Sequence, residues 1–202
     1  MSEETTTAPK ASRPKPGERK VQILQTLAAM LQEPGGDRVT TAALAHRLQV
    51  SEAALYRHFA SKAQMFEGLI EFIERSIFML INQITSHEED AFRQLRAILM
   101  MLLGFAEKNP GMTRVLIGDA LVTEDDRLQE RINQITDRIE TSVKQCFRTA
   151  IAQGKLPQQA DPAVRANLFV SYVLGRWLRY AKSGFRQMPS IGADQQIVLL
   201  IT

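Results

Sequence analysis

The stretch that decides the fold is Thr40-Thr41-Ala42-Ala43-Leu44-Ala45-His46-Arg47-Leu48-Gln49-Val50-Ser51-Glu52-Ala53-Ala54-Leu55-Tyr56-Arg57-His58-Phe59. Thr40 and Ser51 are typical N-cap residues, so the stretch predicts one short helix through Leu48 and another through about Phe59. Ala45 is small enough for the two helices to approach closely, and the apolar residues between the caps supply a small core. Two short capped helices joined by a tight turn indicate a helix-turn-helix, although an ordinary helical hairpin would give the same pattern.

A helix-turn-helix places the N-terminal residues of its second helix against base edges in the major groove of DNA. Here a glutamate can accept a hydrogen bond from cytosine N4, and an alanine can touch a thymine methyl group. Donors for phosphates follow, and Lys62 stands at a helix start, where free N–H groups also favour a phosphate. The predicted DNA-binding residues are Arg19, Lys20, Thr40, Ser51, Glu52, Ala53, Ala54, Tyr56, Arg57, His58 and Lys62.

The excess positive charge lies in the N-terminal third of the chain. Residues 1–62 carry nine Lys or Arg and six Asp or Glu, whereas residues 63–202 carry sixteen of each. This asymmetry suits an N-terminal part that meets a polyanion and a remainder that meets protein. Residues 1–17 hold three prolines and predict a disordered basic tail. Such a tail is either a solvated terminus or an arm that reaches DNA.

Apolar residues at helical spacing predict an all-α chain of about nine helices, with no alternating strand pattern and no repeat. We expect a helix-turn-helix DNA-binding domain over residues 18–62 and a helical partner-binding and dimerisation domain over 63–202. Residues 91–108 are apolar nearly all round, which predicts a helix buried in the bundle with no polar group on its apolar arc. The expected helices cover about 18–32, 40–48, 51–59, 61–84, 91–108, 110–120, 124–153, 162–183 and 191–201.

Several function classes find no support in the sequence. No apolar run reaches the roughly 18 residues of a membrane span, and no secretory signal precedes the first helix, so a cytoplasmic location is expected. The single cysteine, Cys146, predicts a buried helical thiol. The three histidines lack metal-ligand spacing, and neither a phosphate-binding glycine loop nor a nucleophile elbow is present. We therefore expect no catalytic residue, no metal and no cofactor.

Residues 50–59, followed by Ser61 and Lys62, resemble the DNA-reading segment of the TetR family. The resemblance implies that Tyr56 and Lys62 hold phosphates while the short second helix reads bases. Gln49 departs from the family, which often has glycine at this turn. If Gln49 adopts a positive φ, it costs about 1 kcal/mol relative to glycine.

The resemblance extends beyond the DNA-reading segment. Residues 66–74, 102–111 and 126–135 are similar to those of a TetR-type family of nucleoid occlusion factors. This similarity implies a homodimer that binds palindromic double-stranded DNA sites on the chromosome and is associated with the nucleoid. It also implies that the DNA-bound protein antagonises assembly of the tubulin-like division GTPase FtsZ.

The helix that begins at Ser61 carries a second apolar face beside its core stripe. Phe72 and Met79 are seven residues apart on this face, and Leu69 lies between the two faces. The face either packs on a neighbouring helix or lines a groove for an extended apolar peptide. In the second case the end of helix 91–108 forms the other wall, where Lys108 can meet an acidic tail. The predicted partner-binding residues are Leu69, Phe72, Met79, Gly104, Lys108 and Asn109.

Two-fold DNA sites need two reading heads, so a homodimer is expected. Helices 124–153 and 162–183 are the natural interface in the TetR family, with Tyr172, Leu174 and Trp177 as candidates, although Trp177 fits a core position equally well. An alternative function is a transcriptional repressor released by a small apolar ligand, as in most TetR relatives. Such a repressor needs a cavity with convergent polar groups, which the densely apolar helix 91–108 does not favour.

Overall fold

The computed structural model describes residues 17–33, 39–122 and 124–202. Within these ranges the chain forms α-helices and one short 3-10 helix, with no strand. This confirms the predicted all-α fold. The helices are α1 (Glu18–Leu31), α2 (Thr41–Arg47), α3 (Glu52–Tyr56), α4 (Lys62–His87), α5 (Ala91–Lys108), α6 (Pro110–Leu116), η2 (Asp119–Leu121), α7 (Asp126–Ala152), α8 (Pro162–Lys182) and α9 (Ala193–Ile201).

The predicted caps begin α2, α3 and α4, of which α2 and α3 form the predicted DNA-reading end. The hydroxyl oxygens of Thr40, Ser51 and Ser61 each accept the backbone N–H three residues further on, at 3.1 to 3.2 Å. The Asp90 carboxylate accepts the N–H of Arg93 at the start of α5, and the Asp161 carboxylate accepts those of Ala163 and Val164 at the start of α8. Each cap satisfies a backbone donor that the helix itself leaves without a partner.

Some helix ends differ from the predictions. The second reading helix was expected through about Phe59, but α3 ends at Tyr56, because Phe59 must turn into the core and Ser61 must be extended to cap α4. The helix predicted over 110–120 ends at Leu116, since Gly118 has a left-handed φ of 77°. The expected tail before Gly17 and the expected stop at residues 34–36 lie outside the described residues.

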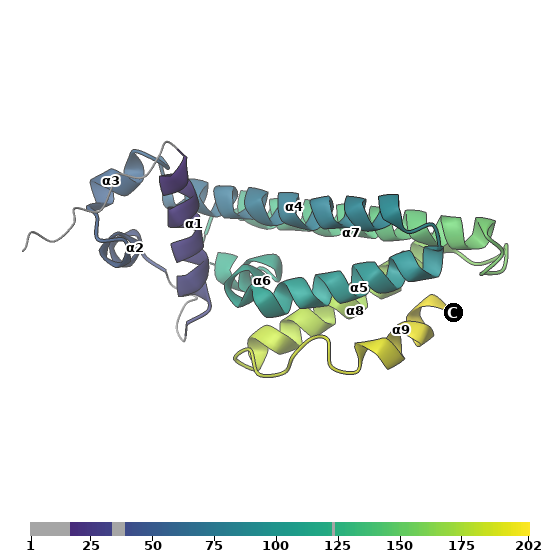
Figure 1. The fold of residues 1–202 in the computed structure, drawn as a ribbon. Coiled ribbons are helices and arrows are strands. Elements are labelled where there is room, and N and C mark those ends of the chain that lie inside the picture. The colour runs from purple at the N-terminus through teal and green to yellow at the C-terminus, as the bar shows by residue number, and fades with distance from the viewer. Residues whose placement is uncertain (1–16, 34–38, 123) are drawn as a thin grey trace, which may run out of the picture.

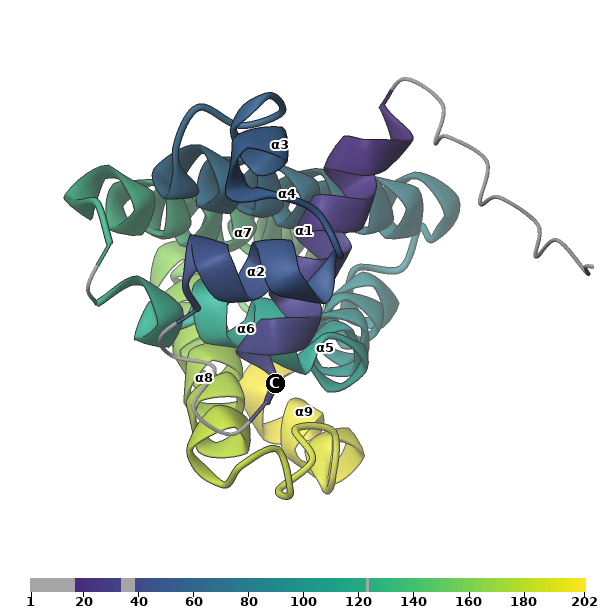
Figure 2. The ribbon, with the colours of Figure 1, turned by 90° about the vertical axis from the view of Figure 1, so that its left-hand side faces the viewer.

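The helices form an elongated bundle with the reading end at one extremity (Figure 1). Helices α4 and α7 run side by side, α5 and α8 lie beneath them, and α9 covers the outer side of α5 and α8. Helix α1 crosses the end of the bundle, and α2 and α3 project beyond it (Figure 1). Figure 2 shows the same end turned toward the viewer. One continuous cluster of buried side chains extends from Ile23 in α1 to Ile201 in α9. The buried core therefore continues across the predicted domain boundary at residue 62. The boundary itself stays a prediction.

Helix α5 lies in the middle of the bundle, as predicted from its apolar composition. Its buried arc includes Ile98, Leu99 and Leu102, all without exposed surface. The expectation of no polar group on that arc is wrong, because Gln94 is also buried. Its amide donates to the carbonyl of Glu88 at 2.6 Å and, more weakly, to that of Thr85 at 3.4 Å, so the desolvated group keeps its hydrogen bonds.

The tightest helix crossing joins the reading end to the bundle. Gly111 in α6 packs so closely on α1 that a Cβ at this position would lie 1.9 Å from the carbonyl oxygen of Ala28. The crossing requires glycine because no other residue leaves this space empty. Gly104 in α5 is the opposite case, since a Cβ there would meet no atom within 4 Å.

The two helical glycines give a matched pair of predictions. We expect Gly111→Ala to lower the free energy of unfolding by about 1–3 kcal/mol or more, because backbone must move to admit the methyl group. Gly104→Ala should instead raise it by about 0.5–1 kcal/mol through the better helix propensity of alanine. Denaturant unfolding of both variants measures the difference, and an equal change in the two would contradict the close crossing.

Candidate nucleic-acid interface

The turn before α3 presents the reading helix to solvent. Gln49 has a positive φ of 54°. This backbone conformation costs a residue other than glycine about 1 kcal/mol, as considered above for this turn. The turn closes through a 3.0 Å hydrogen bond from the Val50 N–H to the Ala45 carbonyl. Ser51, Glu52 and Ala53 then lie exposed at the start of α3, where a groove-reading helix needs them.

Glu52 is held toward α2 by a chain of hydroxyl groups. Thr41 donates its hydroxyl proton to the Glu52 carboxylate at 2.7 Å, and the Tyr56 hydroxyl donates to Thr41 over a long 3.5 Å. Tyr56 is 44% exposed and remains accessible to a phosphate. If Glu52 binds the amino group of a DNA base, that group must share the carboxylate with the Thr41 hydroxyl. The sequence did not reveal this constraint.

Lys62 is already occupied by a partner from the bundle. Its ammonium group forms an ion pair with the carboxylate of Glu124, in the segment that leads into α7. The Lys62 side chain is 31% exposed and the Glu124 side chain only 10%. The predicted phosphate contact of Lys62 therefore requires an exchange of Glu124 for a phosphate. Nothing in the sequence pairs two residues so far apart in the chain.

The remaining cations lie around the same end of the molecule. Arg19 donates to the Gln22 side chain at 2.7 Å, and the Lys20 ammonium lies 5.5 Å from the centre of the Phe59 ring. Arg57 is exposed beyond α3, and His58 is half-buried. The predicted DNA-binding side chains thus come from α1, α2, α3 and the start of α4, which gather at one end (Figure 2).

The second apolar face of α4 is open to solvent within the described structure. Phe72 is 46% exposed and Met79 is 61% exposed, so neither is covered by a neighbouring helix. The prediction for Leu69 as a partner contact is wrong for this conformation, because Leu69 has no exposed surface and belongs to the core. Across from α4, Lys108 is exposed, while the Asn109 amide donates to the Phe105 carbonyl at 2.8 Å.

Helix α8 carries an exposed stripe that the sequence analysis did not single out as an interface. Val164, Leu168, Ser171, Gly175 and Leu178 are all exposed and follow one another at alternating spacings of four and three. That spacing places them on one side of the helix and was readable from the sequence.

The three predicted dimerisation residues lie beside this stripe or below it. Tyr172 and Leu174 are half-buried on its two flanks. Trp177 is 1% exposed, and its indole N–H donates to the Leu102 carbonyl at 3.1 Å. Trp177 is therefore a core residue, and its prediction as an interface residue is wrong.

Within the described residues, no three His, Cys, Asp or Glu side chains come together as metal ligands. Cys146 is buried, as predicted, and burial raises the pKa of its thiol to about 11. A thiol with such a pKa is almost fully protonated at neutral pH and a poor nucleophile. None of the helices in the described ranges is long and apolar enough to cross a membrane.

Comparison with known families agrees with this architecture. Residues 23–69 match the bacterial regulatory proteins of the tetR family, and residues 89–202 match the SlmA-like form of the tetracyclin repressor-like C-terminal domain. A solved TetR transcription regulator from Haloarcula marismortui superposes with a TM-score of 0.78 at 16% identity, covering 91% of this chain and 96% of that one. The fold and the exposed reading helix therefore define a DNA-binding protein of the TetR family.

Individual relatives identify the group within the TetR family to which the chain belongs. The nucleoid occlusion factor SlmA of Alteromonas mediterranea is 49% identical over 88% of this chain and 91% of its own length. The SlmA of a Marinomonas species is 48% identical over 92% of this chain and 94% of its own length. The chain belongs to the SlmA family of nucleoid occlusion factors, which confirms the resemblance read from residues 66–74, 102–111 and 126–135.

The Lys62–Glu124 ion pair generates a prediction about DNA affinity. We expect Glu124→Gln to strengthen binding to all duplexes about 1.4- to fivefold per subunit, because a partly exposed pair of this kind is worth about 0.2–1 kcal/mol and no longer competes with phosphate. The gain should vanish in the Lys62→Ala background, which forms the matched control of a double-mutant cycle. Fluorescence anisotropy with specific and random duplexes measures it, and a gain that persists without Lys62 would contradict the exchange.

The salt dependence of binding tests the phosphate contact itself. Lys62→Ala should weaken binding to every duplex alike and reduce the slope of log K against log salt by about one per contact, or about two per dimer. Ala53→Ser should instead change sequence preference and leave most non-specific affinity in place, since Ala53 is exposed at the start of α3 and is predicted to face the bases. An unchanged slope in Lys62→Ala would remove Lys62 from the phosphate contacts.

Proposed function

We propose that this nucleoid occlusion factor acts as a DNA-bound homodimer that binds the tubulin-like division GTPase FtsZ and antagonises its assembly over the nucleoid. The proposal covers two surfaces with separate roles. The α2–α3 end reads palindromic sites, and a groove between α4 and α5 receives the partner. The chain is a binding protein in this proposal rather than an enzyme, and its place in the cell is the nucleoid.

The observation that carries the partner site is the exposure of Phe72 on the α5 side of α4. Glu74 pairs with Arg131 and Arg138 of α7, so α7 flanks α4 on that side. Phe72 is two residues earlier and therefore about 160° away around the helix. Its ring therefore points away from α7. The described residues leave Phe72 46% exposed.

The facing side of α5 provides the second wall and the charge. Gly104 has open space where a side chain would stand, and Lys108, one turn further on, forms no ion pair within the described residues. An exposed aromatic ring, open space beside Gly104 and a cation without an ion pair in the described residues suit an extended peptide that carries apolar and acidic residues. A peptide anchored on Phe72 and paired with Lys108 fits this groove.

The dimer is supported by the exposed stripe of α8. Three of its members, Val164, Leu168 and Leu178, are large apolar side chains, and Ser171 and Gly175 between them leave room for a partner helix to approach. A second copy packed on this stripe would remove the apolar surface from water and bring two reading ends to one duplex.

Phe72 separates partner binding from folding and DNA binding. We expect Phe72→Ala to leave the melting temperature nearly unchanged, because the ring is already half in water. It should leave operator affinity unchanged but abolish most of the effect on FtsZ polymers, since aromatic anchors commonly contribute about 2 kcal/mol or more at an interface. The three measurements are thermal unfolding, fluorescence anisotropy with an operator duplex, and sedimentation of FtsZ polymer in the presence of DNA.

Phe66 is the matched control for Phe72 on the same helix. It is 1% exposed, so Phe66→Ala should cost about 3–5 kcal/mol of stability and impair every activity together. If Phe72→Ala behaved like this control, with lost stability and lost DNA binding, Phe72 would be a core residue and the groove would be wrong.

Leu168 tests the dimer surface. Leu168→Glu should raise the dimer dissociation constant at least about tenfold, because it places a carboxylate in an apolar interface, and operator affinity should fall with it. Leu199→Glu is the matched control, since Leu199 is also an exposed leucine, 80% exposed against 54% for Leu168, but lies on α9. Sedimentation velocity measures both. Dissociation in the control alone would move the interface from α8 to α9.

A further inference from the structure

Thr41 makes an unusual hydrogen bond for a threonine inside a helix. The other helical threonines of the described structure each donate to the backbone carbonyl four residues earlier, which is common for hydroxyl side chains in helices. They are Thr26, Thr85, Thr113, Thr136, Thr141 and Thr149. Thr41 instead donates its hydroxyl proton to the Glu52 carboxylate on the neighbouring helix, at 2.7 Å.

The place of Thr41 in the chain explains this difference. Thr41 is the first residue of α2, so no residue of that helix lies four positions before it. Its hydroxyl group therefore has no carbonyl of its own helix to bind and is available to another element. Glu52, the first residue of α3, accepts the proton.

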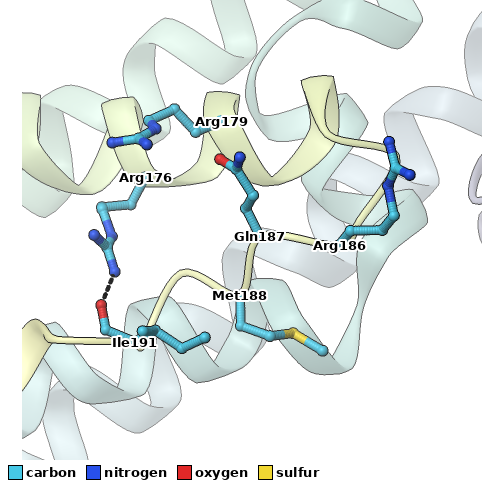
Figure 3. A pocket seen from close by; sticks show the side chains of 6 residues that line it. All are labelled: Arg176, Arg179, Arg186, Gln187, Met188 and Ile191. Atoms are coloured by element: carbon cyan, nitrogen blue, oxygen red, sulfur yellow. Dashed lines mark hydrogen bonds between the residues drawn. The ribbon is translucent and has the colours of Figure 1, made fainter.

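A contact in the bundle illustrates a purely structural use of a side-chain donor. Between α8 and residues 183–192, Arg176 donates to the backbone carbonyl of Ile191 (Figure 3). That bond joins one stretch of chain to another. The Thr41 bond ends on an exposed side chain, and the described residues give the second Glu52 carboxylate oxygen no hydrogen bond. It therefore orients a charged group that a ligand can reach.

Glu52 is an unfavourable residue at a surface that meets DNA. Its carboxylate is exposed and forms no ion pair within the described residues. Because phosphates repel a carboxylate, Glu52 lowers the affinity for every duplex unless it accepts a hydrogen bond from a base. The amino groups that bases present in the major groove are cytosine N4 and adenine N6.

A carboxylate discriminates between bases only if it stays in place. A free glutamate side chain has several rotatable bonds and can turn into water when it meets an unsuitable base. The Thr41 bond holds Glu52 against α2 and leaves one carboxylate oxygen for a base amino group. Guanine O6 and thymine O4 are acceptors, and they repel a carboxylate that cannot turn away.

The same hydroxyl group lies beside a predicted phosphate contact. The Tyr56 hydroxyl is 3.5 Å from the Thr41 hydroxyl oxygen, which is too long for a strong hydrogen bond. Phosphate contacts fix the register of a protein on DNA, whereas base contacts read the sequence. A duplex bound through Tyr56 would thus bring its bases to a carboxylate that Thr41 already orients.

We propose that Thr41 is a positioning residue that determines sequence specificity, because it orients Glu52 toward the amino group of a cytosine or an adenine. This inference rests on the proposed function, in which the α2–α3 end reads DNA. Thr41 needs no base contact of its own in this role. Loss of its hydroxyl group should relax the preference at one base pair of each half-site and leave the phosphate contacts in place.

Binding selections from randomised duplexes with the full chain test this role. Wild-type protein gives the preferred site, and Glu52→Ala identifies the base pair whose preference depends on Glu52. Thr41→Val keeps the shape of threonine without the hydroxyl group and should lower that preference about three- to tenfold. Thr41→Ser keeps the hydroxyl group and should retain the preference. Fluorescence anisotropy with duplexes that differ only at this base pair measures the ratio of Kd values.

Three further variants separate positioning from other effects. The double variant Thr41→Val/Glu52→Ala should discriminate no worse than Glu52→Ala, since Thr41 acts through Glu52. Thr26→Val is the matched control, because the Thr26 hydroxyl donates to the Gln22 carbonyl, and it should keep the wild-type preference. Thermal unfolding checks that each variant is folded, and Thr41→Ala repeats the test if valine destabilises the chain.

The outcomes distinguish this inference from the function on which it rests. An unchanged preference in Thr41→Val, or equal losses in Thr41→Val and Thr41→Ser, would overturn the role of Thr41 and leave DNA reading intact. An equal loss of affinity for all duplexes in Thr41→Val would also overturn it. If Glu52→Ala kept every wild-type preference, Glu52 would read no base and the role of Thr41 would be wrong. Equal binding of all duplexes by wild-type protein would contradict the proposed function itself.

Discussion

The contact on which the rest of the structure depends is the crossing of α1 and α6 at Gly111. The two backbones approach so closely that the Ala28 carbonyl occupies the place of a side chain. Helix α1 carries the reading end, while α6 follows directly from the central helix α5. A crossing without side chains between the helices leaves little freedom for sliding, so α2 and α3 have a fixed position relative to the bundle.

Charged groups reinforce the same attachment from the opposite side. Glu74 of α4 binds two arginines of α7, and Lys62 at the start of α4 binds Glu124 just before α7. The Glu124 and Glu74 side chains are 10% and 21% exposed, but their cationic partners are 31–56% exposed, so each pair stays within the range of partly exposed pairs. The long helix that leaves the reading end is thereby tied to its neighbour along its first half.

Much of this fold could be predicted from local rules. The caps at Thr40, Ser51 and Ser61 and the buried central helix follow from residue type and helical spacing. Spacing also places Phe72 on a second face of α4, but it left open whether a neighbouring helix covers that face. The predictions that failed have a common cause, because each failed residue contacts a neighbour that is distant in the chain. Leu69 and Trp177 are covered by other helices, and Gln94 finds carbonyl partners that spacing cannot indicate. The pairing of Lys62 with Glu124 spans 62 residues and leaves no local trace.

The Lys62–Glu124 pair also affects which polyanions the reading end can distinguish. A carboxylate held beside the ammonium group is an internal competitor whose effective concentration is fixed by the fold. An isolated anion from solution must displace it unaided and gains little. If Tyr56, the start of α3 and Lys62 bind DNA as proposed, a docked duplex presents its phosphate at a comparable effective concentration and can win the exchange. In that proposal the Glu124 carboxylate disfavours isolated anions relative to a docked DNA backbone.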